Sequence, residues 1–353
     1  MSNIIDYAKY YGTRTFKEVP FNEIDALVLA NIAYTNLSIL KDKLPLSLKD
    51  ACKIYFDEMT YDKIKNKRKV YRYAHNTLSN IKNTIRYKDL IIMDYTRIID
   101  DEKQFGALTL TDNNKIFISF EGTNEYISGW REDFYMAANF PVPSQKLAIE
   151  YLTKIAKKTS YFKKIYLMGH SKGGNLAVVA GAFSNILIQN RIVAIYDLDG
   201  PGVRKEEFNS LGYKRIIPKI KKYVPEESIV GMILNSKDDY NVIESNSYGI
   251  LQHHATSWQC FGSYFINAKQ SKSSLRFKKE INEFIESNTQ EELQAIVAEI
   301  FNIFKKTDLK SIEIVSLNKI IEIINYIKNK EIDPKIKSKL LTIFNIILNL
   351  YKK

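Results

Sequence analysis

Hydrophobic positions in the first third of the chain recur at helical spacing. Asn22, with Asp25 three residues later, is a suitable N-cap for a helix. The apolar residues that would share one face of that helix are Ile24, Leu27, Val28 and Ile32. Residues 45–100 continue in the same style and include a basic stretch. The pattern therefore predicts that the first third of the chain is mainly helical.

Alternation of apolar and polar positions replaces the helical pattern near Phe105. Every second residue is apolar on either side of residues 112–114. The apolar members are Leu108, Leu110, Ile116, Ile118 and Phe120. The intervening Asp-Asn-Asn segment consists of residues suited to a positive φ, so the sequence predicts a β-hairpin.

Short apolar runs and helical patterns then alternate along the middle of the chain. Ser144 is the expected N-cap of one helix, and a helix of small residues is expected after Gly173. Strands are expected at residues 165–168, 192–198 and 229–234. Strands that alternate with helices indicate a parallel sheet covered on both faces, which is an α/β fold.

Helical periodicity alone continues beyond about residue 275. We therefore expect an α/β domain over residues 1–270 and a helical C-terminal extension over residues 271–353. Residues 45–100 lie within the first unit and are candidates for a helical lid over a site, because they are rich in aromatic residues.

The composition is that of a globular protein, with 45% hydrophobic and 26% charged residues among 353. Lys and Arg exceed Asp and Glu by 52 to 40, which leaves a net charge of +12. Such a surplus is typical of proteins that bind nucleic acid or anionic membranes. The lysines are spread along the whole chain, however, and the densest group, residues 63–72, fits a solvated helix face. We therefore expect no nucleic-acid partner.

Cofactor, metal and membrane-spanning chemistry find little support in the sequence. Cys52 and Cys260 make no disulfide framework and have no neighbouring ligand at metal-binding spacing, so neither a metal nor a cofactor is expected. The chain starts without a signal-peptide pattern, and its most apolar stretch, residues 340–351, is interrupted by asparagines. These features predict a soluble, cytoplasmic protein. Lysines on the C-terminal helices would permit contact with a membrane surface, although ordinary packing is favoured.

One motif carries recognisable chemistry. Gly169-His170-Ser171-Lys172-Gly173 is a G-x-S-x-G sequence between an expected buried strand and an expected helix of small residues. This is the setting of a nucleophile elbow, in which small residues permit a cramped turn and the serine projects at a helix N-terminus. The sequence therefore predicts Ser171 as a nucleophile.

A serine nucleophile needs a base, and the chain has only four histidines. His75 lies in the helical first third, well before Ser171, and the side chain of His170 should point away from that of its neighbour. His253 and His254 remain as candidates for the base, and their spacing does not separate them.

The acid should lie between the serine and the histidine in hydrolases of this type. Asp238 and Asp239 closely follow the strand expected at residues 229–234, which would place them at the carboxyl end of a strand. Asp199, which precedes Gly-Pro-Gly at the end of an earlier expected strand, is the second choice, and Asp197 is a further candidate.

Backbone N–H groups should form an oxyanion hole near the serine. One is expected from Lys172, directly after the nucleophile, and the other from residues 120–123 at the end of the hairpin. Gly122 would allow close approach of the backbone, and Thr123 could fix its own N–H through its hydroxyl. A simple tight turn explains residues 120–123 equally well.

Together these residues resemble class 3 (fungal-type) lipases, and they are most similar to a bacterial family of lipase-like α/β-hydrolases. The resemblance covers the chain from its start to about residue 265. It is carried by the segments at residues 3–7, 20–25, 129–134, 169–177 (GHSKGGNLA), 199–202, 239–240, 249–253 and 257–258. It implies an α/β-hydrolase fold of the class 3 lipase type, with a mostly parallel sheet flanked by helices.

The resemblance also implies roles for individual residues. Ser171 would be the nucleophile, Asp239 the acid and His253 the base, with Thr123 and Lys172 at the oxyanion hole. The implied function is an intracellular serine esterase or lipase that acts on a small-molecule ester or a lipid. The alternative is a binding module, or an acyl transferase, built on the same fold with the helical tail as its contact surface.

Three further expectations concern the surroundings of this site. Glu121 stands where many class 3 lipases have an arginine, which changes the charge beside the oxyanion loop. Trp130, Glu132 and Asp133 are expected to be structural, because the triad is complete without them. Lys172, together with the basic surface, would suit an anionic ester or a phospholipid.

Overall fold

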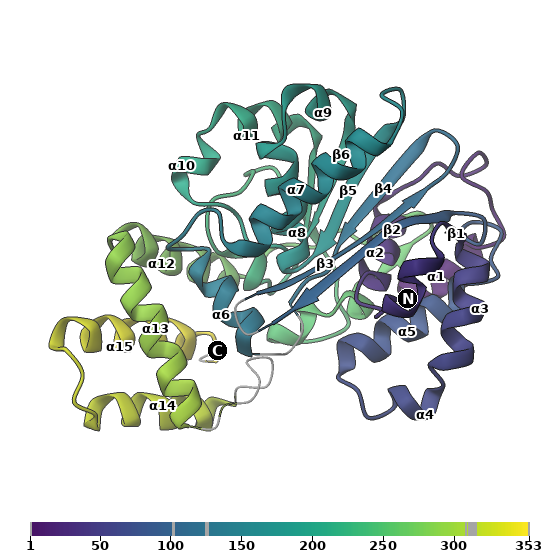
Figure 1. Ribbon diagram of the computed structural model, residues 1–353. Helices are drawn as coiled ribbons and strands as arrows, with labels where there is room; N and C mark the ends of the chain where they lie inside the picture. The colour runs from purple at the N-terminus through teal and green to yellow at the C-terminus, as the bar shows by residue number, and fades with distance from the viewer. Residues whose placement is uncertain (1, 101–102, 124–126, 308, 310–315, 352–353) are drawn as a thin grey trace.

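The computed structural model describes residues 2–100, 103–123, 127–307, 309 and 316–351 (Figure 1). Its centre is an eight-stranded sheet in which the strands follow one another in chain order. The strands are β1 (Leu46–Ser47), β2 (Ile91–Ile99), β3 (Gln104–Thr111), β4 (Lys115–Phe120), β5 (Lys164–His170), β6 (Ile192–Leu198), β7 (Ile220–Pro225) and β8 (Asn241–Ile243). Strands β1 to β4 pair antiparallel and β4 to β8 pair parallel. The expected α/β fold with a mostly parallel central sheet is confirmed.

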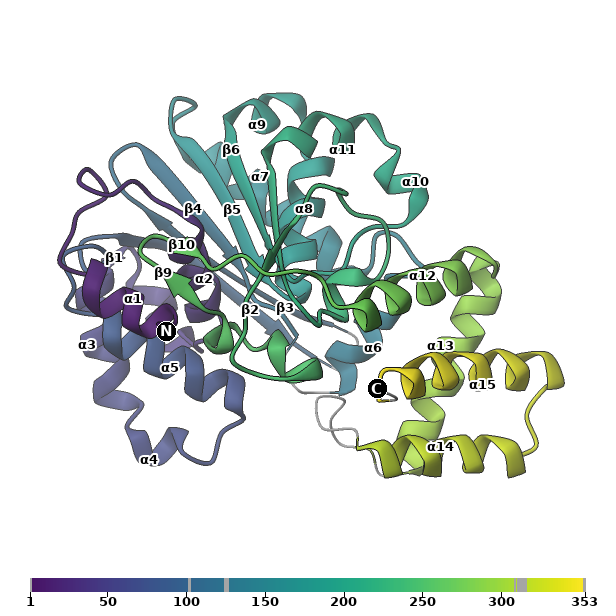
Figure 2. The same cartoon turned by 180° about the vertical axis from the view of Figure 1, so that it is seen from behind.

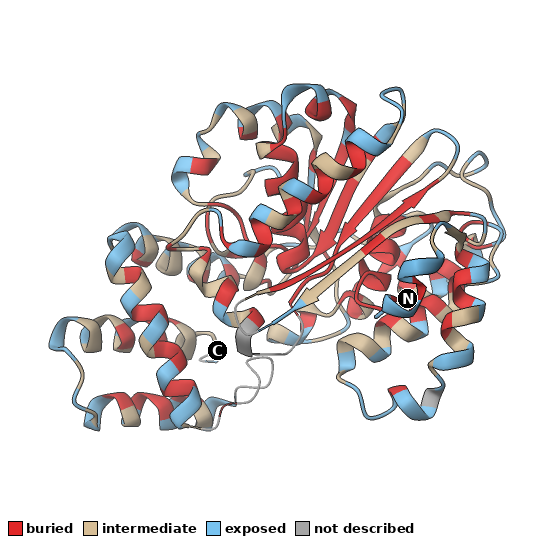
Figure 3. Cartoon of the chain, viewed as in Figure 1, coloured by how far each residue is buried: buried red, intermediate tan, exposed pale blue. Residues whose placement is uncertain are grey.

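The sheet is buried on both faces (Figure 3), which explains why its central strands are apolar almost throughout. Side chains of β4 alternate between the two faces. Phe117 packs into one hydrophobic cluster, whereas Ile116 and Ile118 pack into the other. The hairpin expected around residues 112–114 is confirmed by the pairing of β3 with β4.

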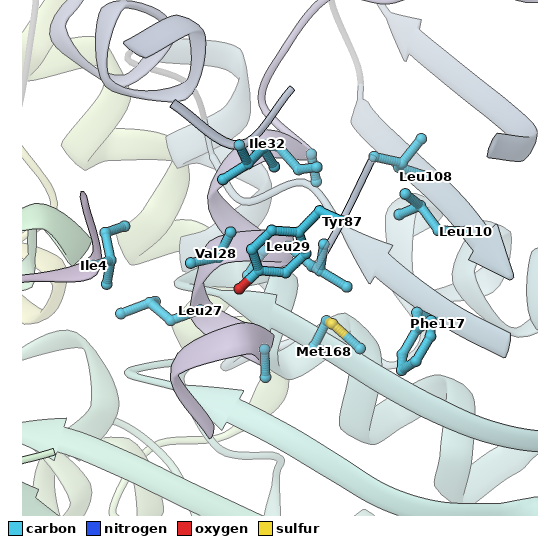
Figure 4. Packing of buried hydrophobic residues seen from close by; sticks show 14 of the residues in the cluster. Ile4, Leu27, Val28, Leu29, Ile32, Tyr87, Leu108, Leu110, Phe117 and Met168 are labelled. Carbon is cyan, nitrogen blue, oxygen red and sulfur yellow. The ribbon is translucent and has the colours of Figure 1, made fainter. Parts of the chain in front are cut away.

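One face of the sheet is covered by N-terminal helices (Figure 2). The N-terminal helices are α1 (Ile4–Tyr11), α2 (Glu23–Ile32), α3 (Leu48–Glu58), α4 (Tyr61–Ile64) and α5 (Lys69–Ile81). Helices α2 and α3 contact the strands, α1 and α5 pack on α2, and α4 packs on α5. Figure 4 shows Val28 and Leu29 of α2 between Ile4 of α1 and the sheet residues Phe117 and Met168. The side chain of Asn22 caps α2 as expected, in a reciprocal capping box with Asp25.

Helices from the middle of the chain cover the other face. They are α7 (Pro143–Lys158), α8 (Lys172–Phe183), α9 (Ile186–Arg191), α10 (Lys205–Phe208) and α11 (Leu211–Ile216). Helix α8 lies against β5 and β6 with nearly every residue buried, which is why it is built from glycine, alanine and valine.

The C-terminal helices form a hydrophobic cluster of their own beside α6 (Ile127–Tyr135). They are α12 (Lys272–Glu286), α13 (Gln290–Lys306), α14 (Leu317–Asn329) and α15 (Pro334–Asn349). The rings of Phe134 on α6 and Phe301 on α13 meet edge to face with centroids 5.6 Å apart. In the views of Figures 1 and 2, α13–α15 and α3–α5 stand on opposite sides of α6. None of the helices that the structure describes is long and apolar enough to cross a membrane.

Three local expectations are corrected. Residues 91–99 form β2 and not a helix, because they pair along their length with β3. Ser144 is not an N-cap, since α7 begins at Pro143 and Val142 occupies the cap position. No residue of the 112–114 turn, all of which the structure describes, has a positive φ. The Asp112 carboxylate instead accepts hydrogen bonds from the N–H groups of Asn114 and Lys115, at 2.9 and 2.7 Å.

Candidate active site

Ser171 lies in a sharp turn between β5 and α8, at the carboxyl edge of the sheet. Its backbone has φ 60° and ψ −133°, a conformation that L-residues other than glycine rarely adopt. Its N–H donates to the carbonyl of Leu198, the last residue of β6, at 3.0 Å. Such strain is typical of functional turns, and it presents Ser171 directly before the N-terminus of α8.

Glycines on both sides of the serine make this turn sterically feasible. A Cβ on Gly169 would come within 2.1 Å of the Gly173 carbonyl. A Cβ on Gly173 would come within 2.2 Å of the carbonyl oxygen of Phe120, at the end of β4. The two glycines therefore let the elbow close on itself and pack against the strand that leads to the expected oxyanion loop.

His253 and Asp199 form a hydrogen-bonded pair beside this turn. Nδ1 of His253 lies 2.6 Å from Oδ2 of Asp199, whose side chain is completely buried. The carboxylate also accepts hydrogen bonds from the Ser228 hydroxyl and from the N–H of Gly231. Donation from Nδ1 to the carboxylate assigns the proton to that nitrogen and leaves the lone pair of the imidazole on Nε2. This is the tautomer that a general base requires.

The position of Asp199 follows from the sheet. It comes directly after β6 and has φ 55°. A Cβ on the following Gly200 would lie 2.8 Å from the carbonyl oxygen of Ser171, so the bend after β6 packs against the nucleophile turn. The neighbouring Asp197 is engaged elsewhere, in a buried ion pair with Lys222 at 2.7 Å.

Asp239 is not the partner of His253, and this expectation is corrected. Its side chain is 95% exposed and lies 3.4 Å from Lys237. Residues 229–234 are not a strand: the strand is β7, at Ile220–Pro225, and a short 3-10 helix, Val230–Met232, follows it. Asp239 precedes β8, which is parallel to β7, and therefore lies at the amino end of a strand, opposite the edge that holds Ser171.

Two other histidines surround His253. The His170 side chain is buried: its Nε2 lies 2.7 Å from the His253 carbonyl oxygen and its Nδ1 3.2 Å from the Tyr34 hydroxyl. Burial and the neighbouring His253 hold the pKa of His170 well below its usual range, so the ring is neutral. The geometry of an elbow predicts that the His170 side chain points away from that of Ser171, and in the structure it contacts the backbone carbonyl of His253.

His254, the alternative base, packs against Tyr73 of α5 with ring centroids 5.8 Å apart. Burial, His253 and Lys69 lower its pKa to about 4. Among the described residues no carboxylate forms a hydrogen bond with the His254 ring, whereas Asp199 does so with His253. The geometry therefore distinguishes the two histidines where their spacing in the sequence could not.

The expected oxyanion loop lies against the elbow. A Cβ on Gly122 would come within 2.0 Å of the Tyr34 hydroxyl and 2.5 Å of the His170 carbonyl oxygen, so only glycine permits this approach. The hydroxyl of Thr123 donates to the Asp133 carboxylate on α6. Lys172 is the first residue of α8, and its N–H is therefore not used by the helix.

Glu121 is neutralised within the protein. Its two carboxylate oxygens accept from the Arg97 guanidinium at 3.0 and 3.1 Å. Burial raises the pKa of Glu121, and the contact with Arg97 opposes that rise. The reversal of charge relative to class 3 lipases is thus balanced by an arginine on β2.

The side chain of Lys172 does not face a substrate, which corrects the expectation that it would attract an anionic ester. It is fully buried, and its ammonium donates to the carbonyl of Gln104 at 2.9 Å and to Glu132 at 3.1 Å. Glu132 in turn accepts from the N–H of Ser144 at 2.7 Å.

A narrow apolar cavity of about 10 Å³ adjoins His253. It is lined by Trp130, Val230, Ile250, Leu251, His253 and His254. On the same measure of volume a single water needs about 10–15 Å³, so the cavity is too small for an acyl group in this conformation. Trp130 belongs to α6 and also packs against the C-terminal cluster, which makes that cluster part of the wall of the site.

The fold and the arrangement of these residues define a lipase-like α/β protein. The model of the Mbeg1-like family matches residues 81–302, which is more than half of the chain, and the chain belongs to that family. The crystal structure of M37 lipase is similar at 16% sequence identity over 61% of this chain and 70% of that chain, with a TM-score of 0.40. No curated protein matches the sequence.

Proposed function

We propose that the protein is a serine hydrolase that cleaves carboxylic esters through an acyl-enzyme. Ser171 would attack the ester carbonyl while Nε2 of His253 takes its proton, and Asp199 would hold the imidazole in the required tautomer. The observation that carries the proposal is the 2.6 Å contact between His253 and buried Asp199 beside a strained serine. Water would then release the acyl group with the same histidine as base.

The tetrahedral intermediate would be stabilised by the backbone N–H groups of Thr123 and Lys172. Both lie where the elbow and the end of β4 meet, and α8 begins at the same point. Developing negative charge on the carbonyl oxygen is favoured by a helix N-terminus and by preorganised N–H donors.

The substrate proposed is a small-molecule ester or a lipid. An apolar cavity next to His253 suits an acyl chain, but its volume requires that the site open before a chain enters. Helix α5 is suitably placed to take part in opening, since Tyr73 contacts His254. Tyr248 and Leu251, on the segment that carries His253, are 83% and 41% exposed and could contact a lipid surface.

The alternative is that the same fold binds a partner or transfers an acyl group without releasing it to water. The narrow cavity and the C-terminal helices at the wall of the site favour this reading. Against it stands the hydrogen-bonded pair of His253 and buried Asp199 beside the strained turn of Ser171, which a pure binding module does not need.

A panel of p-nitrophenyl esters with acyl chains of about two to sixteen carbons tests the proposal, with and without detergent micelles. These chains range from water-soluble to lipid-like. We expect turnover that is abolished in Ser171→Ala, and acceleration by detergent if opening limits entry. Repeating the assay with an added alcohol separates hydrolysis from transfer. Folded protein that turns over none of these esters under any of the conditions would contradict esterase activity.

A further inference from the structure

The residue after the nucleophile carries a buried positive charge. The Lys172 side chain is completely buried, and its ammonium has three neighbours. It donates to the carbonyl oxygen of Gln104 at 2.9 Å and to Glu132 at 3.1 Å, and it lies 3.8 Å from Oδ1 of Asp133.

Stability alone does not account for this charge. Removing an ammonium and a carboxylate from water carries a large desolvation penalty, and apolar residues of similar volume are often at least as stabilising as a buried ion pair. A methionine would fill the same space without that penalty. The charge therefore calls for a role beyond packing.

The partners of the ammonium lead directly to the expected oxyanion loop. The side-chain amide of Gln104 donates to the carbonyl of Gly122 at 3.1 Å. The Asp133 carboxylate accepts from the hydroxyl of Thr123. The Lys172 ammonium is thus connected through Gln104 to Gly122 and through Asp133 to Thr123. Both Gly122 and Thr123 belong to the loop that approaches the elbow.

We propose that Lys172 is a positioning residue that fixes the oxyanion hole from within the protein. Its backbone N–H would be one donor of the hole, and its ammonium would hold Asp133 and Gln104 so that the second donor, at Thr123, keeps its place. The inference rests on the proposed esterase function, because only that function requires an oxyanion hole.

The charge state of Asp133 makes the effect of Lys172 on the oxyanion loop measurable. Four groups face its carboxylate: Lys172 from α8, Thr123 from the loop, Glu132 from α6 and His253. Burial raises the pKa of Asp133 to about 6, while Lys172 and the Thr123 hydroxyl oppose the rise. Oδ1 accepts no hydrogen bond from the described residues, so the ammonium is its principal source of stabilisation. Removing the ammonium should raise the pKa of Asp133 further, and the carboxyl would then be protonated at a higher pH.

The test compares Lys172→Met with Lys154→Met. Lys154 of α7 pairs with Asp94 of β2 at 2.8 Å, so the second substitution removes a lysine ion pair that has no contact with Glu132, Asp133 or Gln104 among the described residues. For short-chain esters we expect Lys172→Met to lower kcat by ~10–100-fold with KM within about threefold, since misplacing a donor mainly affects the transition state. Lys154→Met should leave both kcat and KM within about twofold.

The pH profile separates positioning from general damage. In Lys172→Met the acidic limb of kcat/KM should move to higher pH, because Asp133 then protonates earlier. Asp133→Asn, which keeps the volume of the side chain, should remove that shift when it is combined with Lys172→Met. A melting temperature measured on each variant reports ordinary destabilisation, which would lower activity without moving the limb.

Several outcomes would overturn the inference. Unchanged kcat in folded Lys172→Met would do so, and so would a loss of kcat with no movement of the acidic limb. If Lys172→Met does not fold, Lys172→Gln and Asp133→Asn test the same connection, and an unaltered limb in both would refute it. A wild type that neither hydrolyses esters nor reacts with a fluorophosphonate would instead refute the proposed function, and the inference with it. If the wild type reacts with the probe but hydrolyses no ester, the labelling rates of the variants replace kcat.

Discussion

The two sides of the candidate site are built on different physical principles. On the base side, Asp199 and His253 are joined by one short hydrogen bond, and neutral His170 contacts the backbone carbonyl of His253. On the oxyanion side, the single positive charge of buried Lys172 faces two acidic groups, Glu132 and Asp133. The base side depends mainly on the orientation of its hydrogen bonds, whereas the oxyanion side depends on the interaction of buried charges from which water is excluded.

The supports of the two sides also differ. Asp199 and Ser171 follow adjacent parallel strands, so the sheet itself places them at one edge. Glu132 and Asp133 belong to α6, which packs against the C-terminal cluster through Phe134 and Phe301. The base side is therefore fixed by the sheet, and the oxyanion side depends partly on helices beyond it.

The largest expected effect concerns the base side. Asp199→Asn should lower kcat by ~10⁴-fold, because an amide no longer holds the required tautomer of His253. Asp239→Asn is the matched control: its side chain is 95% exposed, so activity should stay within about twofold. Turnover of one ester by the two variants gives the comparison, and equal activities would refute the assignment of Asp199.

A smaller effect should appear in stability as a function of pH. Burial lowers the pKa of His170 and of His254 in the folded protein, the latter to about 4. Each group then binds protons more readily when unfolded, so its contribution to stability is complete above the unfolded pKa near 6.5 and is lost as pH falls. Denaturant titrations at pH 7 and pH 5 should give a lower free energy of unfolding at pH 5.

His254→Asn provides the control for that measurement. The variant should show a weaker decline between pH 7 and pH 5, since one of the two histidines no longer titrates. Burial raises the pKa of Asp133 and gives a contribution of opposite sign, so Asp133→Asn should steepen the decline. A free energy of unfolding that rises on acidification in the wild type would contradict the lowered pKa values of the two histidines.

The smallest expected effect concerns the charge of the substrate. Residues 63–88 contain no Asp or Glu, and Lys69 of α5 is near enough to His254 to lower its pKa. We expect Lys69→Gln with Arg72→Gln to reduce the preference for an anionic over a neutral ester of equal chain length by about threefold, and less at high salt. The same change at exposed Lys146 and Lys157 of α7 should have no such effect. Equal rates on both esters in the wild type would remove the case for charge selection.

The parts of the molecule that sequence predicted well have local causes. Gly169 beside Ser171, the Asn22 cap and the short apolar strand at residues 192–198 are each determined by neighbours in the chain. Elimination among the four histidines leaves His253 and His254 as candidates for the base, and the resemblance selects His253. The contact of His253 with Asp199 is consistent with that choice.

The missed parts depend on contacts distant in the sequence. Residues 229–234 are apolar because they pack on the C-terminal cluster, not because they form a strand. The expected strand favours Asp238 and Asp239 over Asp199, and the resemblance then selects Asp239. The inward direction of the Lys172 side chain is likewise set by α6, whose residues lie some forty positions earlier. Sequence alone predicts that a lysine beside a nucleophile is exposed, because its buried carboxylate partners cannot be identified without the fold.

Labelling with a fluorophosphonate probe, followed by intact mass, tests the central claim most directly. An activated serine at the elbow predicts one adduct on the wild type, none on Ser171→Ala, and much slower labelling of Asp199→Asn than of Asp239→Asn. Folded wild type that remains unlabelled, with detergent present to favour opening, would contradict the claim of an activated Ser171 and favour a binding role for the fold.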